Sequence, residues 1–264
     1  MPSFESLRRH HRDPDKGLQV DSLSVAYAGH TVLDSVSFEV RPHEVVGIIG
    51  PNGAGKTTLL DLVCGRRTPD SGRVSWGGRR IGRTKPHRLA TLGISRVEQD
   101  PVLAEDQSVL SNVMAGADRR ERSSIMPRPE RRQATAADRV LSERAREILR
   151  TLGILDHEDD DPAGLPWGVR GRVHLAKALI TEPQLVVLDE PGAGLSRADA
   201  TALGRTVRRL THRVTFLLVD HRMDLVLDVC DRVVVLVEGR VVASGTPDQI
   251  RADPAVQAAY LHED

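Results

Sequence analysis

The chain has 264 residues, of which 39% are hydrophobic and 28% are charged, as is typical of a folded globular protein and not of a disordered one. Lysine plus arginine and aspartate plus glutamate each number 37, so the formal net charge is zero. This balance argues against a generic basic nucleic-acid binder and against an acidic tail, although a local arginine patch remains compatible with it.

Targeting and redox features exclude further classes. No apolar run approaches the roughly 18 residues that a membrane span requires. Residues 1–17 are polar, have no apolar centre typical of a secretory signal, and are expected to form a disordered or loosely attached leader. Cys64 and Cys230 lie in apolar segments without metal-ligand spacing, which favours buried free thiols in a reducing cytosol.

The first third of the chain is predicted to contain short strands and one helix. Residues 18–40 alternate as strands do, and 45–49 form a continuous apolar run typical of a buried parallel strand. A glycine-rich turn follows, and 57–64 has the apolar spacing of a helix. Residues 70–100 are rich in glycine and arginine and are expected to form short strands.

The middle of the chain, from 105 to 180, is predicted to be mostly helical. Helical spacing is clear over 139–152, through Val140, Leu141, Ala145, Ile148 and Leu149. The polar stretch 118–135 is predicted to be a surface insertion, and the acidic stretch 156–161 a solvated loop.

After residue 180, strands and helices alternate again. Strands are expected at 185–188, 216–219, 233–237 and 241–243, and helices at 223–229 and after Ser196, where a capping-box-like start occurs. Two α/β blocks separated by a helical block predict an α/β fold with a parallel-sheet core and an inserted helical subdomain.

The most specific motif is Gly-Pro-Asn-Gly-Ala-Gly-Lys-Thr at 50–57, which fits the pattern G-x-x-x-x-G-K-[ST] between a predicted strand and a predicted helix. Glycines let backbone N–H groups surround phosphate oxygens, and the helix N-terminus adds its positive dipole end. Lys56 is one of only four lysines in the chain, whose excess of arginine is most simply explained by codon usage. It is expected to supply a compact ammonium to the β- and γ-phosphates. Thr57 supplies a hydroxyl to Mg²⁺. The expected nucleotide contacts of this loop are Gly50, Pro51, Asn52, Gly53, Ala54, Gly55, Lys56, Thr57 and Thr58.

A second motif, Leu-Val-Val-Leu-Asp-Glu at 185–190, places two carboxylates at the end of an apolar strand. The carboxyl ends of parallel strands share one edge of the sheet, where the phosphate loop also lies. Asp189 is expected to reach Mg²⁺ directly or through water, and Glu190 to act as the general base on an attacking water. Alone, this pair is more simply a solvated strand end.

The ordered set of motifs resembles the ATP-binding cassette family, the ATPase subunits of ABC transporters, over roughly residues 18–262. In chain order the matching features are Tyr27, the phosphate loop, Gln99, Leu-Pro-Trp-Gly at 165–168, Asp189 with Glu190, the loop 192–196, and His221. The resemblance implies a P-loop NTPase (RecA-like) core with an antiparallel β subdomain and an inserted α-helical subdomain. It assigns 18–104 and 181–262 to the core and β subdomain, and 105–180 to the helical subdomain.

The resemblance also implies roles for individual residues. Tyr27 would stack on adenine, Gln99 would contact Mg²⁺ or the attacking water, and His221 would hold the γ-phosphate and position Glu190. Without the family order, Tyr27 is equally a small-core aromatic, Gln99 a surface residue and His221 a structural histidine. In this family the nucleotide lies between two subunits, so a dimer is implied. Its signature residues Leu165, Trp167 and Gly168 would face the partner's nucleotide.

Several details resemble the ATPases of branched-chain amino acid importers. These have a Leu-Pro-Tyr-Gly signature, a polar insertion before it, and a C-terminal pattern like the Asp-Pro-Ala-Val-Gln-Ala-Ala-Tyr-Leu at 253–261. Urea and short-amide importers and lipopolysaccharide-export ATPases share parts of this. The chain departs from the family at Pro166 in place of serine and at Val169 in place of glutamine. It also has Asp220 and Arg222 on either side of His221, where the branch commonly has glutamate and aspartate. These departures leave open a weaker contact with the nucleotide of the partner subunit.

The resemblance therefore implies an ATPase that powers solute uptake through a separate membrane permease, on the cytoplasmic face of the membrane. A permease helix would dock near Gln99, a solute-binding protein would act indirectly, and the second ATPase would be an identical or a sister chain. One alternative is a non-catalytic cassette that binds ATP and regulates an active paralogue. Another is a soluble cassette acting on ribosomes or DNA, although such proteins usually hold two cassettes or a long coiled coil.

Overall fold

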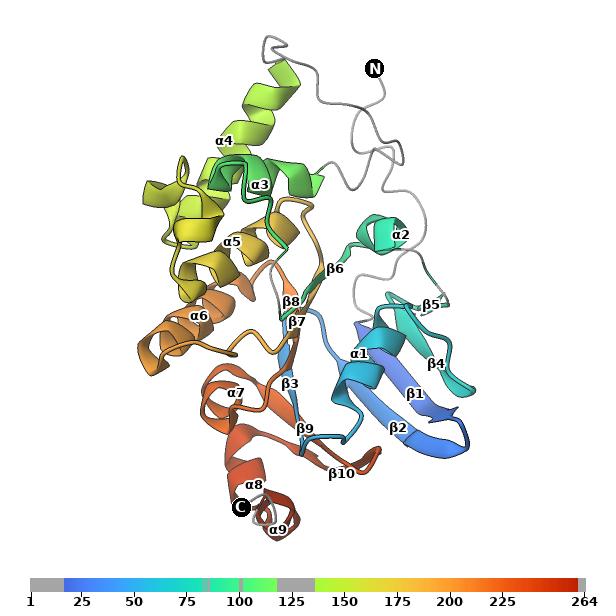
Figure 1. The fold of residues 1–264 in the computed structure, drawn as a ribbon. Coiled ribbons are helices and arrows are strands. Elements are labelled where there is room, and N and C mark those ends of the chain that lie inside the picture. The colour runs from blue at the N-terminus through green and yellow to red at the C-terminus, as the bar shows by residue number, and fades with distance from the viewer. Residues whose placement is uncertain (1–16, 83, 85, 100–101, 118–135, 261–264) are drawn as a thin grey trace.

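Two β-sheets and a block of helices make up the fold in this computed structural model, which describes residues 17–82, 84, 86–99, 102–117 and 136–260 (Figure 1). Almost all of the expected leader at 1–17 and all of the expected insertion at 118–135 lie outside the described residues. None of the described helices is long and apolar enough to cross a membrane.

The central sheet has six strands in the order β10-β9-β3-β8-β7-β6. These strands are β3 (Val45–Ile49), β6 (Ile94–Val97), β7 (Leu185–Asp189), β8 (Thr215–Val219), β9 (Arg232–Val237) and β10 (Arg240–Gly245). β3 pairs in parallel with β8 and β9, and β7 pairs in parallel with β6 and β8, whereas β10 pairs antiparallel with β9. The described chain thus contains the predicted core of parallel strands.

Alternate residues of the central strands belong to two different hydrophobic cores. In β8, Phe216 and Leu218 pack with the helices of one face, whereas Leu217 and Val219 join the core on the other face. β7 and β9 alternate in the same way. Because successive side chains point to opposite faces of a strand, a strand buried on both faces must be continuously apolar. This explains the unbroken apolar runs in the sequence.

A four-stranded antiparallel sheet lies on one side of the central sheet, with the first helix packed beside it (Figure 1). Its strand order is β2-β1-β4-β5, with β1 (Leu18–Tyr27), β2 (His30–Val40), β4 (Ser71–Trp76) and β5 (Arg79–Ile81). Helix α1 (Lys56–Val63) buries Leu59, Leu60 and Val63 in the same core as Leu18 of β1. The small sheet and the central sheet therefore hold α1 between them.

Of the remaining helices, the first packs through Leu89 on the same core as α1, and the others cover the opposite face of the central sheet, extend beyond its edge or follow its last strand (Figure 1). They are α2 (Pro86–Thr91), α3 (Val109–Ala117), α4 (Ala136–Thr151), α5 (Trp167–Leu179), α6 (Arg197–Leu210), α7 (Met223–Val229), α8 (Pro247–Ala252) and α9 (Pro254–Tyr260), with 3-10 turns η3 (Leu155–His157) and η4 (Pro162–Gly164). α3 approaches α5 so closely that a Cβ added to Gly116 would meet the Lys177 carbonyl oxygen at 2.3 Å. The buried Asn112 fixes the loop before α3, since its amide nitrogen donates to the carbonyls of Ala104, Gln107 and Ser108.

Several local predictions need correction. The range 70–100 contains helix α2 as well as strands, and the acidic stretch 156–161 includes most of η3. Val140 has apolar spacing with its neighbours but is 71% exposed, whereas Ala145 and Leu149 form the buried face of α4. Periodicity identifies the helix, but only the packing of its neighbours decides where its buried stripe begins.

Candidate phosphate and hydrolysis site

The segment 50–57 connects β3 to α1 and forms a loop whose backbone requires glycine. Gly53 and Gly55 have φ values of 80° and 99°, in the left-handed region that favours glycine. A Cβ on Gly55 would also meet the Leu33 Cδ2 atom at 2.7 Å and the Val32 oxygen at 2.9 Å. Gly55 is the N-cap of α1, and no side chain caps the helix there. The N-terminus of α1 therefore presents backbone N–H groups at the predicted phosphate position.

Lys56 lies inside this loop and is only 7% exposed. Its ammonium donates to the Gly50 oxygen at 2.5 Å and to the Pro51 oxygen at 2.8 Å. Thr57 follows in the first turn of α1 and is exposed, with Thr58 partly buried behind it. The lysine thus stabilises the loop through two of its carbonyl oxygens, while Thr57 is accessible to solvent.

Asp189 and Glu190, at the carboxyl end of β7, interact with different parts of the chain. The Oδ2 atom of Asp189 accepts a hydrogen bond from the Nη2 atom of Arg96 at 2.6 Å, and this pair is largely buried. Glu190 adopts a φ of 46°, and its backbone N–H donates to the Val219 oxygen of β8 at 2.7 Å. Sequence reasoning missed Arg96, although a charged residue between the apolar ends of the strand Ile94–Val97 is a signal that could have found it.

His221 follows β8 and reaches the same edge of the sheet. Its Nδ1 atom lies 3.8 Å from the Glu190 Oε2 atom and 3.8 Å from the Asp220 Oδ1 atom. Asp220 is completely buried and accepts hydrogen bonds from the backbone N–H groups of Gly192, at 2.7 Å, and Arg222, at 2.9 Å. Asp220 therefore ties the loop after Glu190 to the loop that carries His221. Sequence reasoning treated Asp220 only as a departure from the family pattern.

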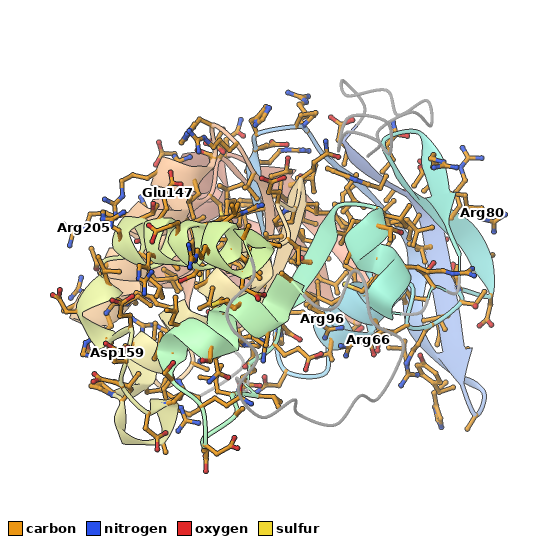
Figure 2. All side chains as sticks on the ribbon, turned by 90° about the horizontal axis from the view of Figure 1, so that it is seen from above. Arg66, Arg80, Arg96, Glu147, Asp159 and Arg205 are labelled. Carbon is orange, nitrogen blue, oxygen red and sulfur yellow. The ribbon has the colours of Figure 1, made fainter. Side chains whose placement is uncertain are left out.

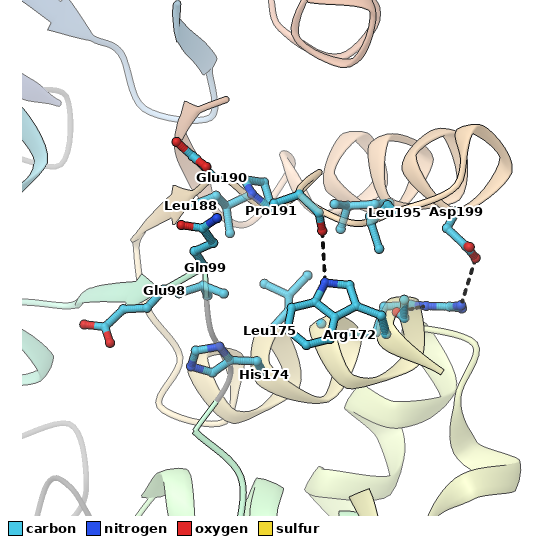
Figure 3. A pocket seen from close by; sticks show the side chains of 16 residues that line it. Glu98, Gln99, Arg172, His174, Leu175, Leu188, Glu190, Pro191, Leu195 and Asp199 are labelled. Carbon is cyan, nitrogen blue, oxygen red and sulfur yellow. Dashed lines mark hydrogen bonds and ion pairs between the residues drawn. The ribbon is translucent and has the colours of Figure 1, made fainter. Parts of the chain in front are cut away.

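A pocket lies between the end of β6, helix α5 and the loop that follows Glu190 (Figure 3). Gln99, Glu190, Trp167 and Gly168 all line it, so four of the predicted site residues meet there. Tyr27, the phosphate loop, Asp189, Leu165 and His221 are outside its lining.

The indole of Trp167, at the start of α5, contacts its own chain. Its Nε1 atom donates to the Ala193 oxygen at 2.9 Å, as the dashed line in Figure 3 shows, and its ring packs against Gly194. The side chain of Val169 is 8% exposed and lies in the core of the helical block. The valine that replaces glutamine in the family pattern thus has a packing role within this chain.

Tyr27 is the last residue of β1 and does not line the pocket just described. Its ring packs against the core around α1. The guanidinium of Arg67 lies 4.7 Å from the ring centroid, in a cation–π contact. Its hydroxyl is buried without a hydrogen-bond partner among the described residues. Arg67 therefore lies over a face of the ring on which adenine is predicted to stack.

Charge interactions shift the pKa of two groups close to the site. Burial alone would lower the pKa of Arg96, but hydrogen bonds to Asp61 and Asp189 raise it above its ordinary value. Burial raises the pKa of Glu98, but the hydrogen bond and positive charge of Arg66 outweigh this effect and hold it below its ordinary value. Both groups therefore stay ionised near neutral pH.

Comparisons with known proteins were made with the whole chain. A family model described as "ABC transporter" matches residues 33–193, and one described as "Branched-chain amino acid ATP-binding cassette transporter" matches residues 240–261. The chain is 32% identical over 254 residues to the high-affinity branched-chain amino acid transport ATP-binding protein LivG of Salmonella typhimurium, covering 93% of this chain and 98% of that protein. It is also 32% identical over 247 residues to the lipopolysaccharide export system ATP-binding protein LptB of Haemophilus influenzae, covering 93% and 97%.

A solved structure has the same fold. The ADP conformation of MJ1267, an ATP-binding cassette of an ABC transporter, superposes with a TM-score of 0.83 at 30% identity. The match covers 94% of this chain and 99% of that one. The predicted fold class, an α/β P-loop NTPase core with added sheet and helical parts, is confirmed.

Proposed function

The chain belongs to the ABC transporter family and is an ATPase subunit, and we propose that it powers the import of branched-chain amino acids or a similar small polar solute. The observation that carries this proposal is that the phosphate loop, Glu190 and His221 follow β3, β7 and β8, which are neighbouring parallel strands of one sheet. The match of residues 240–261 to the branched-chain amino acid model supports the solute class. The equal identity to LptB supports export as the second candidate.

The loop residues fit a bound ATP. Gly53 and Gly55 hold a backbone that L side chains rarely adopt, and Lys56 is buried where its ammonium faces the loop's interior. Under this proposal Thr57, Asp189 and Gln99 hold Mg²⁺, which offsets the charge of the phosphates when bound with ATP. Tyr27 stacks on the adenine, and Glu190 accepts a proton from the attacking water. His221 holds the γ-phosphate and positions Glu190.

We propose that two such chains act together. Leu165, Trp167 and Gly168 at the start of α5 would contact the nucleotide of a second ATPase, identical or related. The range 105–180 would move as the helical subdomain against 18–104 and 181–262, with a separate permease docked near Gln99 at the membrane surface. A solute-binding protein would select the solute. A non-catalytic role as a regulatory cassette is less well supported, because the Val169 departure is accounted for by packing.

Replacing the proposed base provides the test of catalysis. Glu190→Gln keeps the size of the side chain but removes its ability to accept a proton, so ATP hydrolysis should fall by about 100-fold or more. Phosphate release by the purified protein with Mg-ATP and its permease measures this. Glu147→Gln, on the exposed face of α4, is the matched control and should hydrolyse ATP as wild type does. Equal rates for Glu190→Gln and wild type would refute the assignment.

Direction and solute require a transport assay. Proteoliposomes that hold this chain with a branched-chain amino acid permease should accumulate labelled leucine when ATP is supplied inside and a solute-binding protein outside. Extraction of lipopolysaccharide in place of leucine uptake would favour the export alternative.

A further inference from the structure

Arg96 lies on β6, three residues before Gln99, and points into the protein. Its side chain is 8% exposed, and Figure 2 labels it toward the middle of the molecule beside Arg66, away from the rim where Arg80 and Arg205 lie. Its Nη1 atom donates to the Asp61 Oδ1 atom at 2.7 Å, and its Nη2 atom donates to the Asp189 Oδ2 atom at 2.6 Å. One guanidinium thus joins two carboxylates from two other elements.

The two carboxylates belong to the elements that carry proposed magnesium ligands. Asp189 ends β7 and is itself a proposed ligand, while Asp61 lies on α1, four residues after Thr57. Residues four apart on a helix lie on the same face, so Asp61 is the neighbour of Thr57 on the side of α1 that faces Arg96. The fixed fork of the guanidinium therefore sets how α1 sits relative to the end of β7.

Both contacts are largely shielded from water. The side chains of Asp61 and Asp189 are 19% and 14% exposed. Removing one partner of an ion pair in such surroundings is destabilising, because it leaves the other charge buried without compensation. Arg96 holds the Oδ2 atom of Asp189. Under the proposed function, the Oδ1 atom of the same carboxylate would face the metal or its waters.

We propose that Arg96 is a positioning residue for magnesium. It binds the Oδ2 atom of Asp189 and the Oδ1 atom of Asp61, and it thereby fixes the distance between the Asp189 carboxylate and the Thr57 hydroxyl on α1. This inference rests on the proposed ATPase site and adds a residue to it. Arg96 does not touch nucleotide or metal itself. A lysine could keep the charge but could not bridge both carboxylates with a rigid fork.

The test measures ATP affinity of the purified full chain by calorimetry, once with EDTA and once with excess Mg²⁺. Arg96→Lys and Asp61→Asn should bind ATP in EDTA as wild type does, because the phosphate loop is intact. Their gain in affinity on adding Mg²⁺ should fall by about tenfold or more, the usual effect of losing a partner that orients a metal ligand. The Mg²⁺ concentration that half-saturates ATP hydrolysis should rise in parallel.

Controls separate positioning from folding. Arg73→Lys alters an exposed ion pair with Asp21 and should leave both affinities unchanged. Equal losses of affinity in EDTA and in Mg²⁺ for the two site variants would mean that Arg96 only stabilises the fold, and would overturn the proposal. If Arg96→Lys does not fold, an unchanged magnesium gain in Asp61→Asn overturns it and a reduced gain supports it. Wild-type protein that binds no ATP at all would instead refute the proposed function.

Discussion

At the scale of single residues, Lys56 shows how a local environment selects one cation. Arginine outnumbers lysine heavily in this chain, yet the phosphate loop holds a lysine. The ammonium is almost fully buried and donates to two carbonyl oxygens of its own loop, at Gly50 and Pro51. A planar guanidinium is wider and presents its donors in a fixed plane, so it does not match this closed space.

Lys56→Arg is therefore expected to weaken ATP binding by at least about tenfold although the charge is kept, because the larger group must displace the loop. Calorimetric titration with Mg-ATP measures the loss. Lys177→Arg on α5 makes the same exchange at a partly exposed position and should bind as wild type does. An unchanged affinity of Lys56→Arg would show that the loop opens more widely in solution than its buried lysine indicates.

At the scale of elements, the loop 192–196 is held from two sides. Trp167 of α5 donates to the Ala193 oxygen, and Arg222, just before α7, donates to the Leu195 oxygen at 3.0 Å. The first contact comes from the helical block and the second from the loop of His221. The position of Glu190, immediately before this loop, therefore depends on elements far apart in the sequence.

Trp167→Phe keeps most of the ring but removes the indole N–H, and it should lower the free energy of unfolding by about 1 kcal/mol, the net value of one hydrogen bond. Unfolding in guanidinium followed by circular dichroism measures the change. Val140→Ala, at an exposed position of α4, provides a comparison and should change stability by less than about 0.5 kcal/mol. Equal stability of Trp167→Phe and wild type would mean that the contact with Ala193 contributes nothing in solution.

At the scale of the whole molecule, two hydrophobic cores share the central sheet, and each contains one cysteine. Cys64 closes α1 on one face, and Cys230 follows α7 on the other, both fully buried and unpaired. Burial raises the pKa of the Cys64 thiol to about 11, and burial likewise raises that of Cys230. Neither thiol forms its reactive thiolate in the folded protein near neutral pH.

The native protein should therefore give no rapid reaction with a thiol reagent such as DTNB at pH 8, and two equivalents should react after unfolding. The raised pKa also implies that the folded state keeps protons which the unfolded state releases above its ordinary thiol pKa near 9. Stability contributed by Cys64 is thus fully present below pH 9 and is lost as the pH rises toward 11. Rapid labelling of one thiol in native protein at pH 8 would indicate local opening of one core.

Much of this protein was determined by the sequence alone. The phosphate loop, the Asp189–Glu190 strand end and the α/β order are local patterns, because each depends on neighbours along the chain and on the apolar runs that both cores demand. The family of the chain followed from their order. The roles of Gln99, Tyr27, His221 and the signature residues are predictions made on the same basis.

Only the tertiary structure decided which distant side chains meet. Nothing in the sequence pairs Arg96 with Asp61 and Asp189, since β6, α1 and β7 are separated by long stretches of chain. β6 and β7 meet by sheet pairing, and α1 meets them by packing on the core that it shares with the sheet. The same holds for the indole of Trp167 on the Ala193 carbonyl and for the burial of Asp220. Patterns along a chain specify elements, whereas contacts between elements depend on how their apolar faces pack, and that packing placed these polar groups together.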